Sequence, residues 1–74
     1  MKVSIEYCTM WSYEPRAVSL AAILKKHCGA EIELIESTGG AFEVVVDGKL
    51  VYSKMSTGEF PDEQQLLKQL VNSL

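Results

Sequence analysis

The first half of the chain changes its hydrophobic period twice, and this pattern restricts the fold more than any other feature. Residues 2–7 alternate between polar and apolar side chains, as in a half-buried strand. From Pro15 to Cys28 the apolar residues recur every three or four positions, as in an amphipathic helix that Gly29 can end. Residues 31–36 alternate again. A strand, a helix and a strand in this order predict a right-handed crossover between two parallel strands.

The second half predicts a hairpin followed by a helix. Residues 42–46 and 50–53 are rich in residues that favour strands, and Asp47-Gly48 between them is a strong hairpin signal. A last helix begins near Asp62, and its apolar positions are Leu66, Leu67, Leu70, Val71 and Leu74. The element order βαβ-ββα predicts an α/β fold. We expect a four-stranded mixed sheet with both helices on one face and the other face largely solvated.

Length and charge limit the class of protein. A chain of 74 residues can build one hydrophobic core, so residues 1–74 are expected to form a single domain. Seven basic and ten acidic residues give a net charge of −3, and no basic run exceeds Lys25-Lys26, which argues against a nucleic-acid partner. Ser4 and Glu6 interrupt the apolar residues near the N-terminus, so we expect neither a signal peptide nor a membrane partner. The chain is expected to be cytoplasmic.

The two cysteines occupy opposite ends of the predicted first helix. Cys8 directly follows the first strand, where the positive end of the helix dipole would lower the pKa of an exposed thiol. A small apolar residue ending a buried strand explains the position of Cys8 equally well. Cys28 lies on the apolar face of the helix, about 20 to 25 Å away, which is too far for a disulfide within one chain. We expect Cys28 to belong to the core, with an intermolecular role as the alternative.

Three further features are weighed as candidate sites. Trp11 and Tyr13, in the loop after the first strand, either cap the edge of the core or line a shallow groove for a peptide or a thiol ligand. Gly39 and Gly40 lead into a strand rather than a helix, so they indicate a turn or a close approach of another chain rather than a phosphate loop. His27 has no suitably spaced ligand residues, so no metal site and no Ser-His-Asp triad are predicted.

Five segments taken together resemble the selenoprotein W family, also called the Rdx group: residues 6–10, 15–17, 39–44, 47–54 and 58–61. The resemblance extends over nearly the whole chain. It implies a thioredoxin-like fold and thiol redox chemistry, often linked to glutathione and antioxidant defence.

The family carries Cys-Xaa-Xaa-Cys or Cys-Xaa-Xaa-selenocysteine after its first strand, and Trp11 stands at the second of these positions. The resemblance therefore implies a monothiol oxidoreductase, in which Cys8 forms a mixed disulfide with glutathione or a protein thiol and no cofactor is tightly bound. This expectation requires the sulfur to be held in the open at the positive end of the helix. Thr9 and Met10 would offer backbone N–H groups to it. The residues expected to bind around this sulfur are Thr9, Met10, Trp11, Tyr13, Gly39 and Gly40.

Two other interpretations remain at this point. One is a catalytically inactive module that binds a protein through the groove around Trp11. The other is a carrier that holds sulfur or selenium on Cys8. The solvated sheet face and the edge strands also leave room for a homodimer.

Overall fold

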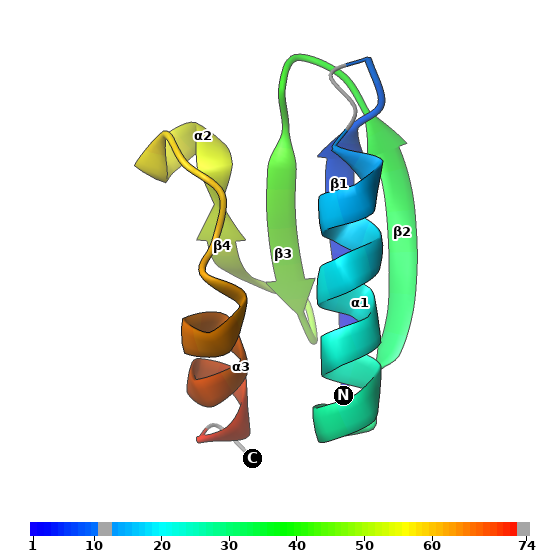
Figure 1. Ribbon diagram of the computed structural model, residues 1–74, viewed down its shortest axis with the longest axis vertical. Coiled ribbons are helices and arrows are strands. Elements are labelled where there is room, and N and C mark those ends of the chain that lie inside the picture. Colours follow the sequence, from blue (N-terminus) through cyan, green and yellow to red (C-terminus); the bar gives the residue numbers. More distant parts are fainter. Residues whose placement is uncertain (11–12, 73–74) are drawn as a thin grey trace.

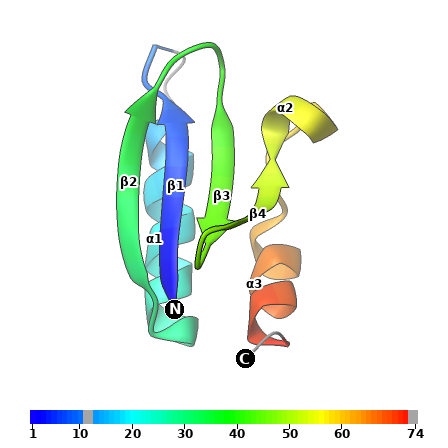
Figure 2. The ribbon, with the colours of Figure 1, turned by 180° about the vertical axis from the view of Figure 1, so that it is seen from behind.

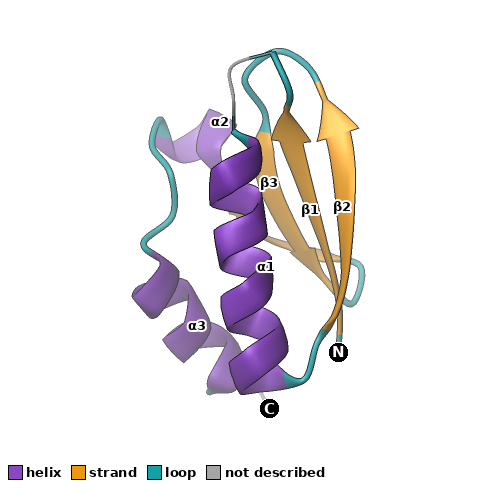
Figure 3. Cartoon of the chain, turned by 45° about the vertical axis from the view of Figure 1, so that its right-hand side comes forward, coloured by secondary structure: helices purple, strands orange, loops and turns teal. Residues whose placement is uncertain are grey.

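The computed structural model describes residues 1–10 and 13–72. Two longer helices, α1 and α3, lie on one face of a four-stranded sheet, and a short helix, α2, follows the last strand (Figure 1, Figure 3). The predicted α/β class is confirmed. The elements in chain order are β1 (Lys2–Cys8), α1 (Glu14–Cys28), β2 (Glu31–Ser37), β3 (Phe42–Val46), β4 (Lys49–Ser53), α2 (Lys54–Thr57) and α3 (Glu63–Val71).

The sheet combines the predicted crossover with the predicted hairpin. Its strand order is β2-β1-β3-β4. The β1–β2 pair is parallel, and the β1–β3 and β3–β4 pairs are antiparallel. Both residues of the turn between β3 and β4 have positive φ, 50° at Asp47 and 84° at Gly48, which suits the right-handed twist of a two-residue hairpin. The pairing of β3 with β4 shifts register between Val44 and Val45, which marks a β-bulge.

The core lies between the sheet and the two longer helices. The alternation of β1 turns Val3, Ile5 and Tyr7 toward the helices, and each is at most 5% exposed. The predicted stripe of α1 is buried against them, and Cys28 packs partly buried at its end. The other buried side chains of the two longer helices and β3 are Ala17, Leu20, Ala21, Leu24, Phe42, Val44, Leu66 and Leu70.

The C-terminal third differs from the prediction in two respects. Helix α2 was not expected. The Tyr52 hydroxyl forms hydrogen bonds at its C-terminal end: its oxygen lies 2.9 Å from the Thr57 hydroxyl oxygen, and it donates to the carbonyl oxygen of Glu59 at 2.7 Å. Val71 is 44% exposed rather than buried, because it lies about 100° around α3 from Leu70. The prediction for Leu74 lies outside the described residues.

The sheet face opposite α1 and α3 has no covering element in the described part of the chain (Figure 2). This agrees with the expected solvated face. Within residues 1–10 and 13–72, no helix combines the length and the apolar content that crossing a bilayer requires.

Candidate functional site

The end of β1 is held by backbone hydrogen bonds from two directions. The N–H of Cys8 donates to the carbonyl oxygen of Ala41 at 2.8 Å, and the carbonyl oxygen of Cys8 accepts from the N–H of Tyr13 at 3.3 Å. Cys8 is 1% exposed and belongs to the hydrophobic core. The expectation of an openly exposed thiol is therefore wrong, because the strand buries Cys8 before the chain turns toward α1.

Several backbone amides near Cys8 and in the first turn of α1 donate to carbonyl groups. Tyr13 is the N-cap residue of α1, and its carbonyl oxygen accepts from Arg16 and Ala17 at 3.1 Å each. The N–H of Thr9 donates to the carbonyl oxygen of Ser37 at 3.3 Å. The amide of Thr9 thus connects this end of β1 to β2, and the role expected of Thr9 at the sulfur stays a prediction.

The loop between β2 and β3 lies against the same end of β1. Its two glycines, Gly39 and Gly40, have φ of 71° and 75°, a region that favours glycine. The hydrogen bond between Cys8 and Ala41 connects the end of this loop directly to the candidate thiol. The structure thus brings the loop of Gly39 and Gly40 to the end of β1, and the binding role that the resemblance implied for them stays a prediction.

The pKa of Tyr7, which precedes Cys8 in the chain, is sensitive to the charges near this end of β1. Burial raises the pKa of the Tyr7 hydroxyl above its ordinary value of 10.0, and the carboxylates of Glu14 and Glu36 raise it further. Glu14 comes from the first turn of α1 and Glu36 from the end of β2. Negative charge from two elements therefore acts on this end of β1.

Tyr13 connects the end of β1 to an aromatic cluster. Its ring lies edge-to-face with Phe60 at 4.6 Å between centroids, and Phe60 lies likewise against Phe42 at 5.3 Å. The guanidinium of Arg16 is 4.3 Å from the Phe60 centroid, and the Lys54 ammonium is 5.3 Å from it. Of the two interpretations of Tyr13, the structure supports the one in which it caps the core, since it is only 9% exposed.

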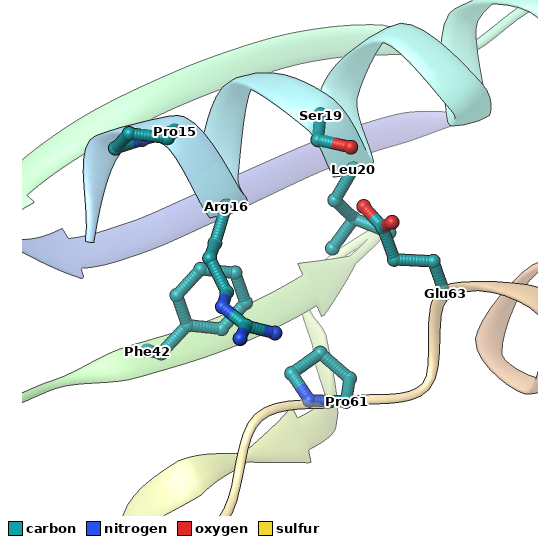
Figure 4. A pocket seen from close by; sticks show the side chains of 7 residues that line it. All are labelled: Pro15, Arg16, Ser19, Leu20, Phe42, Pro61 and Glu63. Atoms are coloured by element: carbon teal, nitrogen blue, oxygen red, sulfur yellow. The ribbon is translucent and has the colours of Figure 1, made fainter.

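A groove of about 230 Å³ runs beside this cluster (Figure 4). Helix α1 forms one wall, β3 contributes to the floor, and the segment leading into α3 forms the other wall. The Arg16 side chain extends from α1 toward the Pro61 side, and Glu63 faces α1 from the opposite wall (Figure 4). The lining residues are Pro15, Arg16, Ser19, Leu20, Phe42, Pro61 and Glu63.

The sequence reasoning missed Arg16, Phe60 and Pro61 as members of one surface. The sequence signal for this surface was the Gly-Glu-Phe-Pro segment at residues 58–61, but its contacts with α1 and β3 are long-range and no local pattern predicts them.

Two predicted site residues lie between β1 and α1. Met10 is 80% exposed, beyond the end of β1. The predicted role of Trp11 falls outside the described residues.

The remaining candidates lie elsewhere. His27 is exposed near the C-terminal end of α1, and Cys28 is partly buried there, at the opposite end of the helix from Cys8. In the described portion of the chain, no three His, Cys, Asp or Glu side chains form a group that could hold a metal ion.

A mixed four-stranded sheet in βαβ-ββα order, with a cysteine at the junction of the first strand and first helix, defines a thioredoxin-like protein. The model of the Rdx family matches residues 2–73, and the chain belongs to that family. The assignment is selenoprotein W-like, as the resemblance predicted, and the family suggests a redox-related function.

Two relatives illustrate the range of the family. Migration and invasion enhancer 1 of Bos taurus is 36% identical over 69 residues, which cover 92% of this chain and 60% of that protein. This chain therefore spans less than two thirds of the length of that relative. Selenoprotein W of Danio rerio is 31% identical over an alignment of 78 positions, covering all of this chain and 91% of that protein.

Two solved structures have the same architecture. A protein from Bordetella parapertussis is similar with a TM-score of 0.90 and 26% identity, over 99% of this chain and 96% of that one. A selenoprotein W-related protein from Vibrio cholerae gives a TM-score of 0.85 and 27% identity, over 96% of this chain and 92% of that one.

Proposed function

We propose that this chain is a thiol-based redox protein in which Cys8 forms a mixed disulfide with glutathione or with a protein thiol. The observation that carries the proposal is family membership over residues 2–73, combined with a cysteine at the junction of β1 and α1. The family suggests redox chemistry, and Cys8 is the thiol at the position where that family places its first reactive residue.

The reaction is a thiol–disulfide exchange. The Cys8 thiolate attacks the glutathione sulfur of a mixed disulfide between glutathione and a protein, a new S–S bond forms, and the protein thiolate leaves. Trp11 occupies the position of the second cysteine, and Cys28 lies at the far end of α1, so release requires a thiol from outside the chain. Reduced glutathione then attacks the mixed disulfide on Cys8, oxidised glutathione is released, and the Cys8 thiolate is regenerated. The reducing thiol pool of the cytoplasm, where we propose that the protein acts, supplies this reagent.

The burial of the Cys8 side chain limits the rate of this exchange. Because Cys8 is 1% exposed, the attack requires a local opening that loosens its contacts with Ala41 and Tyr13. The rate of adduct formation then depends on the free energy of this opening as well as on the thiolate fraction. We expect a slow reaction that mild denaturant accelerates.

Mass spectrometry after incubation with oxidised glutathione tests the proposal. In mild denaturant a glutathione adduct is expected on Cys8, in addition to one on the more exposed Cys28, and reduced glutathione should remove it. Cys8→Ser should abolish the Cys8 adduct, whereas the control variant Cys28→Ser should retain it. An adduct that stays confined to Cys28 at denaturant concentrations that expose Cys8 would rule the mechanism out.

The burial of Cys8 also favours a second candidate, a protein-binding module without catalysis. In that case Cys8 is a core residue and the groove proposed around Trp11 binds a partner. Binding that survives Cys8→Ser and is lost in Trp11→Ala would favour this function over the redox function. Loss in Cys8→Ser alone would argue against it.

A further inference from the structure

The uncovered face of the sheet, which is turned toward the viewer in Figure 2, carries several glutamates on neighbouring strands. In the register of β1 with β3, Glu6 lies directly opposite Glu43, and Ser4 lies opposite Val45. On the other side of β1, Ser4 lies opposite Glu33. The alternation of side chains places these residues on the face turned away from Val3 and Ile5, whose side chains are buried under the helices.

The opposition of Glu6 and Glu43 is unfavourable within the isolated chain. Side chains directly opposite on neighbouring antiparallel strands have Cβ atoms about 5 Å apart, and like charges there repel. The hydrogen bond of Glu6 comes from the Ser37 hydroxyl at 2.9 Å, which is a neutral donor. Lys2, a basic residue on the same face, lies at the opposite end of β1 and pairs in register with Glu31. The centre of the face therefore has a net negative charge.

Exposed aliphatic side chains lie among these glutamates. Ile35 of β2 is opposite Glu6 and is 37% exposed. Leu50 of β4 is opposite Val45 and is 51% exposed. Beside Ser4 and Val45 the surface is hollowed. A partner that covers this face must therefore present apolar and cationic groups side by side.

We propose that this face is a docking surface for a basic amphipathic helix of a partner protein. Its lysine or arginine side chains would neutralise Glu6, Glu33 and Glu43. Its aliphatic side chains would cover Ile35, Val45 and Leu50. The inference goes beyond the proposed redox function, because it does not require the Cys8 thiol to react.

The structure favours a helix over other occupants. The interior strands β1 and β3 are hydrogen-bonded on both sides, so a partner on the face packs through side chains, as α1 and α3 do on the opposite face. A second copy of this chain would bring the same glutamates together in an isologous contact. The net charge of −3 opposes such self-association further.

A pair of designed peptides tests this inference. Each would be about 18 residues long, or five helical turns, with leucine on one face and either lysine or glutamate on the other. Amide chemical shifts are followed during titration of the intact protein. We expect the lysine peptide to bind, with the largest changes in β1, β2, β3 and β4 at the positions of the proposed surface. The glutamate peptide should not bind.

Matched charge reversals locate the binding site. Glu43→Lys should weaken binding of the lysine peptide by about tenfold or more, because it places a cation at the centre of the face. Glu59→Lys changes the net charge equally, lies on the exposed segment between α2 and α3, and should leave binding within about twofold. Equal weakening by both variants, shift changes confined to α1 and α3, or a stable dimer that occupies the face would each overturn the inference. None of these outcomes depends on glutathione adduct formation, so the two proposals can fail separately.

Discussion

The N–H of Cys8 donates to the carbonyl oxygen of Ala41 at 2.8 Å, across 33 residues of sequence. This bond joins the backbone of the candidate cysteine to the loop that carries Gly39 and Gly40. Substitutions in this loop should therefore alter the reactivity of the Cys8 thiol, although the loop contains no cysteine. Four predictions follow from this and from the surrounding contacts.

Gly39→Ala should destabilise the protein by about 1 kcal/mol, because φ is 71° at this position and a Cβ is disfavoured there. A Cβ at Gly39 would meet no atom within 4 Å, so the cost is conformational rather than steric. Urea denaturation measures the change. Gly39→Asn is the matched control, because asparagine tolerates the left-handed region and should cost less. Equal losses in both variants would contradict this explanation.

Cys28 should react with a soluble thiol reagent before Cys8 does, because Cys28 is only partly buried and Cys8 is 1% exposed. Low concentrations of urea should accelerate the reaction of Cys8 more than that of Cys28. Single variants, Cys8→Ser and Cys28→Ser, assign the two kinetic phases. A fast phase that disappears in Cys8→Ser would show that Cys8 is accessible in the native state.

Phe60→Ala should destabilise the protein by about 2 kcal/mol, less than for a fully buried phenylalanine, because Phe60 is half-buried. The loss removes ring contacts with Tyr13 and Phe42 and the cation contact with Arg16. Thermal and urea unfolding measure it. The control Met55→Ala changes a side chain that is 66% exposed and should alter stability by about 0.5 kcal/mol at most. A comparable loss in both variants would argue against a specific role of the cluster.

The raised pKa of Tyr7 predicts a loss of stability in alkaline solution. The folded state holds the Tyr7 proton more tightly than the unfolded state, whose value is near 10.0. The contribution is fully present below that value and is lost as pH rises through the higher folded pKa. Tyr7→Phe removes it, so the variant should lose less stability than the parent chain above about pH 10. Urea unfolding across this range measures the difference, and parallel pH dependences would refute the prediction.

Much of the fold could be predicted from local patterns. The period of residues 2–7 and 31–36 indicated the parallel pair, and Asp47-Gly48 indicated the hairpin, because each signal depends on neighbours in sequence. Asp62 accepts hydrogen bonds from the N–H groups of Gln64 and Gln65, as its place before the last helix suggested.

The candidate site was predicted less completely. The sequence pattern predicted that Cys8 ends a strand and precedes a helix, and the structure confirms this placement. The family assignment agrees with it. Its side chain belongs to a core cluster that includes Phe42 and Leu66, which are remote in the sequence and come together only when the chain folds. The aromatic cluster around Phe60 was not foreseen for the same reason, since Tyr13, Phe42 and Phe60 are far apart in sequence.

The order of the four strands and the two longer helices, the crossover and the position of the candidate thiol were thus determined by the sequence itself, through hydrophobic period and turn chemistry. The burial of Cys8, the groove beside Arg16 and the opposition of Glu6 and Glu43 were decided only by the tertiary structure. These features arise where strands and loops remote in sequence meet, and a local pattern contains no information about which side chains will then face one another.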